Sequence, residues 1–193
     1  MPGALVIGLF VGGRGSRFGG VAKGNLKLPG GVRLIERLLG VCNSVLPESP
    51  LVLVGQRAEY HRLALPTLID MPAGIGPLGG LRALLDFATE RGFAAAVTLA
   101  CDLPYVTPEL VRRIAEEAPA ALALAPRDRG LYYPLTARYS VDALPAVDDA
   151  IAAREHSLQK LYARLGDGAA SLSLNDAELR ALRDWDSPED LAS

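Results

Sequence analysis

A glycine-rich, basic segment near the N-terminus has the composition of a loop that binds phosphate groups. Residues 12–24 read Gly-Gly-Arg-Gly-Ser-Arg-Phe-Gly-Gly-Val-Ala-Lys-Gly and directly follow an apolar run. Glycines allow the backbone to approach an anion closely, and successive N–H groups and basic side chains can meet its charge. The segment therefore predicts a phosphate-binding loop, although a solvated glycine loop without a ligand would have the same composition.

Three familiar glycine motifs do not fit this segment. A Walker A loop needs Gly-Lys followed by Ser or Thr, but Ala22 precedes Lys23 and Gly24 follows it. A dinucleotide fingerprint would need its third glycine at Phe18. It would also need an acidic residue to hold a ribose at the end of the second apolar run, where Gly55 and Gln56 stand instead. The G-x-S-x-G pattern of a nucleophile elbow is absent from the sequence.

Two carboxylates stand at the ends of other apolar runs. Asp70 precedes a segment of small residues, 71–81, against which a flat base could lie while the carboxylate accepts hydrogen bonds; the same glycines could instead pack a helix closely on a sheet. Asp102 follows an apolar run, and a magnesium ion that binds nucleotide phosphates needs only one or two carboxylates. Asp102 could otherwise be a turn or helix-cap residue. We expect the adjacent Cys101 to be a small buried hydrophobe and assign His61 and His156 no chemistry.

Strands that alternate with helices must position these loops. Four apolar runs show little alternation, which is typical of parallel strands buried on both faces. They predict strands over 4–11, 51–55, 94–100 and 120–125, and a shorter run predicts a further strand over 67–70. A 3.6-residue periodicity predicts helices over 34–46, 78–88 and 110–118, the last opened by Thr107-Pro108. After about residue 126 we expect an extended or edge segment at 132–139, helices at 141–153, 157–165, 176–182 and 187–191, and a strand at 170–174.

This order predicts one α/β domain over 1–193 with a mostly parallel sheet. In such sheets ligands bind outside the carboxyl ends of the strands, where the three loops lie. The 193 residues carry 20 Lys+Arg and 22 Asp+Glu, a net charge of -2, which argues against a general nucleic-acid binder. Cys42 and Cys101 fit neither a disulfide framework nor a zinc site. We find no signal peptide and no membrane span, and expect a cytoplasmic protein.

The glycine loop and its neighbours resemble a known family. Residues 9–19 with Lys23 are similar to the L-x-G-G-x-x-x-R-x-G…K signature of the GT-A-like nucleotidyltransferases, and within them most similar to the molybdenum cofactor guanylyltransferases, the MobA family. The resemblance continues at Asp70 with Gly-Pro-Leu-Gly-Gly-Leu (76–81), at Cys-Asp-Leu-Pro-Tyr (101–105) and at Asp-Trp-Asp-Ser-Pro-Glu-Asp-Leu (184–191). The four blocks occur in order along nearly the whole chain.

This resemblance implies a three-layer α/β/α, Rossmann-like fold, with a nucleotide-binding half at about 1–125 and an acceptor-side elaboration at about 126–193. It implies transfer of GMP from GTP to molybdopterin-bound molybdenum cofactor with release of pyrophosphate. The partners would be GTP and the cofactor, with transient contact to proteins that deliver or accept it; neither nucleic acid nor membrane is implied.

The resemblance also assigns residues. It implies nucleotide binding by Leu9, Gly12, Gly13, Gly15, Lys23, Asp70, Gly80 and Asp102. It implies catalytic roles for Arg17, Lys23 and Asp102, with Arg14 as an outer helper. The cofactor would be Mg2+ on Asp102, and Asp186 is a further candidate ligand, although Asp186 also has the context of a helix cap.

Several residues depart from the family pattern. Asp184 and Asp186 stand where relatives usually carry Asn, Ala22 where they commonly carry Asp, and Tyr133 where they often carry His. Two alternatives therefore stay open. One is a related nucleotidyltransferase with another substrate pair, such as CTP with the pterin or a sugar phosphate acceptor. The other is a degenerate nucleotide-binding protein that transfers nothing.

Overall fold

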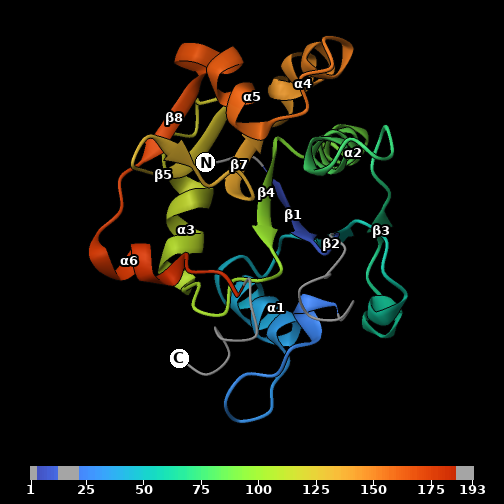
Figure 1. Ribbon diagram of the computed structural model, residues 1–193, viewed down its shortest axis with the longest axis vertical. Coiled ribbons are helices and arrows are strands. Elements are labelled where there is room, and N and C mark those ends of the chain that lie inside the picture. The colour runs from blue at the N-terminus through green and yellow to red at the C-terminus, as the bar shows by residue number, and fades with distance from the viewer. Residues whose placement is uncertain (1–3, 13–21, 186–193) are drawn as a thin grey trace.

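A mixed sheet forms the centre of the computed structural model, which describes residues 4–12 and 22–185 (Figure 1). Its strand order is β3-β2-β1-β4-β7-β5-β6, and β8 pairs with β5. The strands are β1 (Leu5–Phe10), β2 (Leu51–Val54), β3 (Thr67–Leu68), β4 (Ala95–Ala100), β5 (Ala123–Asp128), β6 (Leu131–Tyr132), β7 (Thr136–Ser140) and β8 (Ala169–Leu172). The helices are α1 (Leu34–Val45), α2 (Pro77–Glu90), α3 (Pro108–Glu116), α4 (Leu144–Ala152), α5 (Leu158–Leu165) and α6 (Asp176–Ala181).

The first four strands form a parallel block that sets the position of the site. β1 pairs in parallel with both β2 and β4, and β2 pairs in parallel with β3. The chain thus moves from β1 outward to β3 and then returns to the other side of β1 with β4. Because strand order reverses between β1 and β4, their carboxyl ends form the edge at which α/β sheets bind ligands.

The segment expected at the edge of the sheet is only partly there. β6 pairs with β5 at the end of the strand order, but β7 lies inside the sheet and is antiparallel to both β4 and β5. β7 is thus extended, which was one of the two alternatives predicted for residues 132–139, whereas the edge alternative is wrong for this strand. Its first four residues are buried, and the Thr98 hydroxyl of β4 accepts a hydrogen bond from the Ala137 N–H at 3.2 Å.

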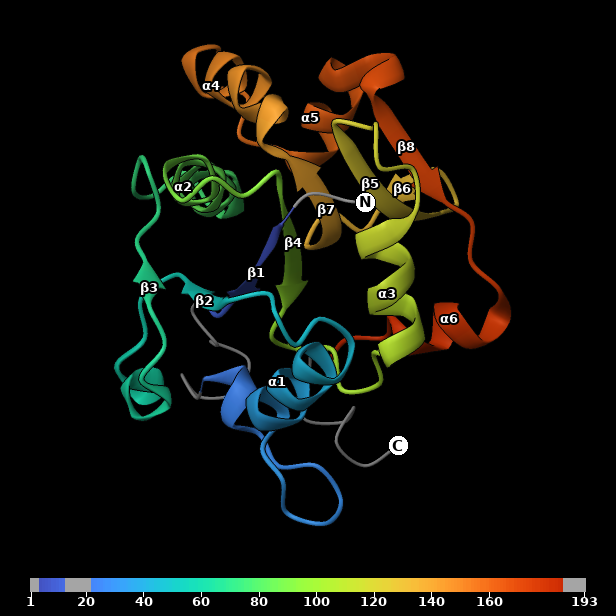
Figure 2. The same cartoon turned by 180° about the vertical axis from the view of Figure 1, so that it is seen from behind.

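Helices cover both faces of the sheet, which makes the three predicted layers. One core cluster joins α1 and α3 to the sheet, and the other joins α2, α4 and α5 to it. From behind, α1 and α3 lie on the viewer's side of the sheet (Figure 2). In β1 the side chains alternate between the clusters, with Ile7 in the first and Val6 in the second. A strand buried on both faces needs apolar residues at every position, which explains its continuous apolar run.

The helix starts follow the expected capping chemistry. The Thr107 hydroxyl accepts from the Leu110 N–H at 3.2 Å at the start of α3, as predicted, and Asn175 caps α6. The helix expected at 187–191 lies outside the described residues. The eight described strands belong to one sheet, and the division near residue 125 into nucleotide and acceptor halves stays a prediction. In the described ranges, no helix combines the length and the apolar character needed to cross a bilayer.

Candidate active site

The carboxyl ends of β1 and β2 meet where the glycine loop begins. Gly55 has φ +96, and a Cβ there would stand 2.8 Å from the Gly12 nitrogen. An added Cβ at Gly12 would lie 4.0 Å from its nearest described neighbour, the Gly55 Cα. The described residues therefore leave room for a side chain at position 12. Gly13, Arg14, Gly15 and Arg17 lie outside the described residues, and the roles expected of them stay predictions.

The structure brings the expected phosphate-binding lysine to the expected metal carboxylate. Lys23 opens a short 3₁₀ helix, Lys23–Asn25, and its Nζ donates to Asp102 Oδ2 at 2.9 Å. Both side chains are 21% exposed, so the pair is partly accessible to a ligand. Tyr60 fixes this helix, because its hydroxyl oxygen accepts from the Gly24 N–H at 3.0 Å.

Main-chain hydrogen bonds hold Asp102 in place from two directions. The N–H of the preceding Cys101 donates to the Phe10 carbonyl at the end of β1, at 3.1 Å. The Asp102 carbonyl accepts from the Trp185 N–H at 2.9 Å, although Trp185 is far away in sequence. Burial raises the pKa of the Cys101 thiol to about 12, so the thiol stays protonated and Cys101 is the buried hydrophobe that its sequence context indicates.

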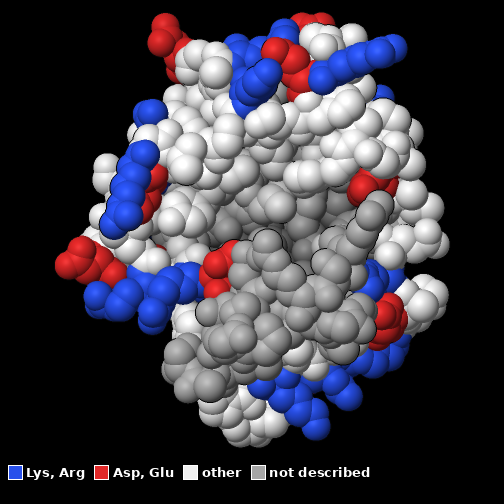
Figure 3. Space-filling view, viewed as in Figure 1, with Lys and Arg blue, Asp and Glu red and all other residues white. Residues whose placement is uncertain are grey.

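A pocket of about 370 Å³ opens beside Asp102. Its walls are the end of β4, the segment 132–136 that leads from β6 into β7, and residues of α6 and the following turn up to Asp184. Basic side chains gather over α6, at the lower left of Figure 3. Burial raises the pKa of Tyr133, and Asp128 and Asp184 add to the shift. The Tyr133 hydroxyl is therefore a hydrogen-bond donor in this pocket at neutral pH.

Asp70 and the start of α2 lie on the other side of β1 and pack closely together. A Cβ on Gly80 would come within 2.7 Å of Val54 Cγ1, 2.9 Å of Phe10 Cε1 and 3.2 Å of Asp70 Oδ1. Burial raises the pKa of the Asp70 carboxyl. The absence of a side chain at Gly80 thus allows α2 to lie close to the sheet, as in the packing alternative, and also leaves Asp70 beside bare backbone.

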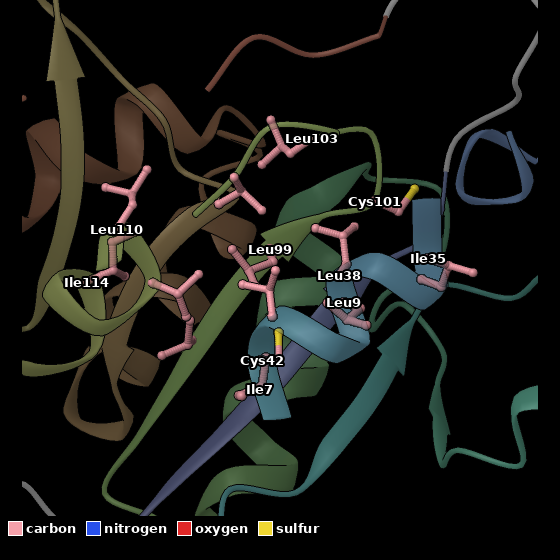
Figure 4. Packing of buried hydrophobic residues seen from close by; sticks show 14 of the residues in the cluster. Ile7, Leu9, Ile35, Leu38, Cys42, Leu99, Cys101, Leu103, Leu110 and Ile114 are labelled. Carbon is pink, nitrogen blue, oxygen red and sulfur yellow. The ribbon is translucent and has the colours of Figure 1, made fainter. Parts of the chain in front are cut away.

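The two residues at the end of β1 point to opposite sides of the sheet. Leu9 is fully buried in the cluster under α1, where Figure 4 shows it near Leu38. The Leu9 side chain therefore lies on the opposite side of the sheet from Gly80 and Asp70, and nucleotide binding by Leu9 stays a prediction. Phe10 is the β1 residue that reaches Gly80, and the sequence analysis missed it. The alternation of β1 between the two cores was the signal, because it places residues 6, 8 and 10 on the α2 side.

Asp102 has few carboxylate neighbours. Within the described residues no group of three or more His, Cys, Asp or Glu side chains could hold a metal ion. Asp186, the other candidate ligand, lies outside those residues, while Asp184 lines the pocket. His61 and His156 are exposed. The described part of the site thus consists of one carboxylate and its lysine, and the carboxylate also lines the pocket.

Comparisons with known proteins identify the family. Residues 8–169 match the family model of the MobA-like NTP transferase domain. A molybdenum cofactor guanylyltransferase of Rhodobacter capsulatus is 34% identical over 189 residues, covering 95% of this chain and 91% of that protein. A probable molybdenum cofactor guanylyltransferase of Pelotomaculum thermopropionicum is 32% identical over 178 residues, covering 91% and 81% of the two chains.

Solved structures show the same fold. Molybdopterin-guanine dinucleotide biosynthesis protein A from Archaeoglobus fulgidus matches with a TM-score of 0.74 at 25% identity, over 96% of this chain and 94% of that one. A nucleotidyl transferase from Methanothermobacter matches with a TM-score of 0.73, over 98% and 94% of the two chains, and at 21% identity it shows the likeness of fold alone. The family model covers most of the chain and both relatives exceed 30% identity, so this chain belongs to the MobA-like NTP transferases and is a nucleotidyltransferase.

Proposed function

We propose that this protein is a magnesium-dependent molybdenum cofactor guanylyltransferase, which transfers GMP from GTP to molybdopterin-bound molybdenum cofactor. The observation that carries the proposal is the Lys23–Asp102 ion pair, which lies at the carboxyl ends of the parallel strands, and Asp102 also lines a pocket suited to an acceptor. The relatives named above as guanylyltransferases support the choice of substrates. We expect the reaction to take place in the cytoplasm, where two free, buried cysteines are compatible with a reducing environment.

On the nucleotide side, charge and backbone replace a protein nucleophile. Lys23, with Arg17 of the glycine loop, would meet the triphosphate, and the amides of the loop would cradle it. The base and ribose would lie near Gly80 and Asp70, whose carboxyl is partly exposed beside the first turn of α2. These groups position the α-phosphorus and neutralise charge, which is what a phosphoryl-type transfer requires.

The residues around Asp102 fit a magnesium ion that is shared with substrate. A hard cation of this kind takes one or two carboxylates and completes its shell with phosphate oxygens and water. Asp102 supplies one partly exposed carboxylate, which accepts a hydrogen bond from Lys23. Its main chain is held by the bonds from Cys101 to Phe10 and from Trp185 to Asp102. When bound, the ion would neutralise phosphate charge; Asp186 is the second residue that we propose as its ligand.

On the acceptor side, the pocket brings a flat substrate to the same carboxylate. Aromatic and apolar residues, Tyr132, Tyr133, Leu135 and Leu182 among them, line it and suit a pterin ring. An oxygen of the acceptor's terminal phosphate attacks the α-phosphorus of GTP. The new P–O bond forms as the bond from the α-phosphorus to the bridging oxygen breaks, and pyrophosphate leaves with that bonding pair.

A related acceptor is the second candidate, because Asp184 lines the pocket and adds a negative charge where the family usually has Asn. Pyrophosphate release with each of the four NTPs, Mg2+ and molybdenum cofactor tests both candidates. Release with GTP alone and only when the cofactor is present supports guanylyl transfer. Release with CTP, or with a sugar phosphate in place of the cofactor, supports the second candidate. GTP binding without any release would show a nucleotide-binding protein that transfers nothing.

A further inference from the structure

The acceptor pocket contains one positive charge that the reaction described above does not use. Arg183 lines the pocket together with Asp102, Tyr133 and Asp184. Among the described residues that line it, Arg183 is the single basic side chain. Lys23, the other cation nearby, is bound to Asp102 and faces the expected triphosphate.

The surroundings of Arg183 hold its guanidinium without neutralising it. The guanidinium carbon lies 5.8 Å from the centroid of the Tyr105 ring, and this ring meets Trp185 edge-on at 6.4 Å between centroids. A cation over an aromatic face gains about 0.5–1 kcal/mol at an exposed site and keeps its charge. Within the parts of the chain that the structure describes, Arg183 forms no ion pair with a carboxylate. Its N–H groups are thus available to an anion.

The backbone that carries Arg183 is anchored at both ends. We call residues 173–185 the C-terminal strap. At its beginning, Arg113 of α3 binds Glu178 at 2.5 Å and the Ser173 carbonyl at 3.3 Å. At its end, the Trp185 N–H donates to the Asp102 carbonyl at 2.9 Å, and the Trp185 side chain is only 3% exposed. Arg183 lies two residues before Trp185. The bond from Trp185 to Asp102 therefore keeps Arg183 close to Asp102, in the lining of the same pocket.

We propose that Arg183 binds the terminal phosphate of the acceptor and so makes the pocket specific for acceptors that carry a phosphomonoester. The inference rests on the proposed function, because it concerns the acceptor of that reaction. A phosphate dianion that enters the pocket comes close to the carboxylate of Asp184, which repels it. The planar guanidinium offers parallel N–H donors that match two phosphate oxygens, and its charge offsets this repulsion. Arg183 thus recognises the acceptor and is not a catalytic residue.

The test compares three variants for acceptor and nucleotide affinity. Arg183→Ala removes the cation, Arg183→Lys keeps the charge but not the planar fork, and Arg180→Ala removes an exposed cation from the same strap outside the pocket. Trp185 is the only tryptophan of the chain and lies beside Asp102, so its fluorescence reports molybdopterin binding without catalysis. Transfer kinetics then give KM for the molybdenum cofactor and for GTP separately.

We expect Arg183→Ala to raise both the Kd for molybdopterin and the acceptor KM about tenfold or more, as for the loss of a charged hydrogen-bond partner. The KM for GTP should change less than about twofold in Arg183→Ala. The acceptor affinity of Arg183→Lys should lie between those of Arg183→Ala and wild type. The acceptor affinity of Arg180→Ala should match that of wild type. Unchanged acceptor affinity in Arg183→Ala, or an equal loss in Arg180→Ala, would overturn the inference. If the wild type binds molybdopterin but releases no pyrophosphate, the proposed function fails while the fluorescence titration still decides the role of Arg183. A wild type that neither binds nor transfers would overturn both.

Discussion

Replacement of Gly80 by alanine tests how closely α2 approaches the sheet beside Asp70. Alanine in place of glycine inside a helix should stabilise the protein by about 1 kcal/mol. At Gly80, however, the new methyl carbon would stand 2.7 Å from Val54 Cγ1 and 2.9 Å from Phe10 Cε1. Overpacking of this kind costs about 1–3 kcal/mol. The net change at Gly80 is therefore between roughly zero and a loss of about 2 kcal/mol.

Gly40 provides the matched control, because it lies within α1, is exposed, and would place a Cβ with nothing within 4 Å. Gly40→Ala should show the uncompensated gain of about 1 kcal/mol, or about 3 °C in Tm for a chain of this size. Gly80→Ala should melt at the wild-type temperature or up to about 6 °C below it.

Thermal and urea denaturation measure this difference, and GTP titration adds a second readout. Because Asp70 Oδ1 would lie 3.2 Å from the new methyl carbon, the carboxyl must move, and GTP affinity should fall at least severalfold in Gly80→Ala only. Equal stabilisation of both variants with unchanged GTP affinity would refute the close packing of α2 and the placement of the nucleotide against it.

Three further substitutions test other parts of the structure. Lys23→Ala should lower the rate of transfer about 100- to 1,000-fold, as single preorganised charge or donor deletions do elsewhere, and should weaken GTP binding in equilibrium titrations; wild-type GTP affinity would contradict its role. Asp102→Asn should keep the Tm but raise the Mg2+ concentration for half-maximal activity, and an unchanged Mg2+ titration would place the ion elsewhere. Arg138→Met should destabilise the protein by about 2–4 kcal/mol in urea, because the buried guanidinium donates to the main-chain carbonyls of residues 117–119, whereas a loss below about 1 kcal/mol would show that water replaces these hydrogen bonds.

Local patterns were sufficient to predict the parallel half of the sheet and its helices. The apolar run of β1 reflects burial on both faces, and the Thr107 cap fixes the start of α3 through a bond to its own neighbour in sequence. β7 was harder, because a run that contains Arg138 does not look like an interior strand. Arg138 is buried because its partners are carbonyls at the end of α3, and sequence periodicity says nothing of that long-range contact.

The same distinction applies to the site. Motifs singled out Lys23 and Asp102, but only the fold shows that they form an ion pair across 79 positions. Side-chain direction at the end of β1 could have been derived from strand alternation, which places Leu9 on the α1 side of the sheet and Phe10 on the α2 side. The pocket could not have been derived, because it depends on where the strap crosses the edge of the sheet and on the main-chain bond from Trp185 to Asp102.

The contacts that anchor the strap affect how the acceptor pocket can change in evolution. One anchor is a bond between two backbone groups, Trp185 N–H and Asp102 C=O, and part of the other is a bond from Arg113 to the Ser173 carbonyl. Bonds to the backbone survive when the strap's own side chains change. Arg183 and Asp184, which are exposed and line the pocket, can therefore vary while Asp102 stays in its place. A duplicated gene could acquire a new acceptor by substitutions in this short segment, and a designer could graft the segment from one relative to another without redesigning the sheet.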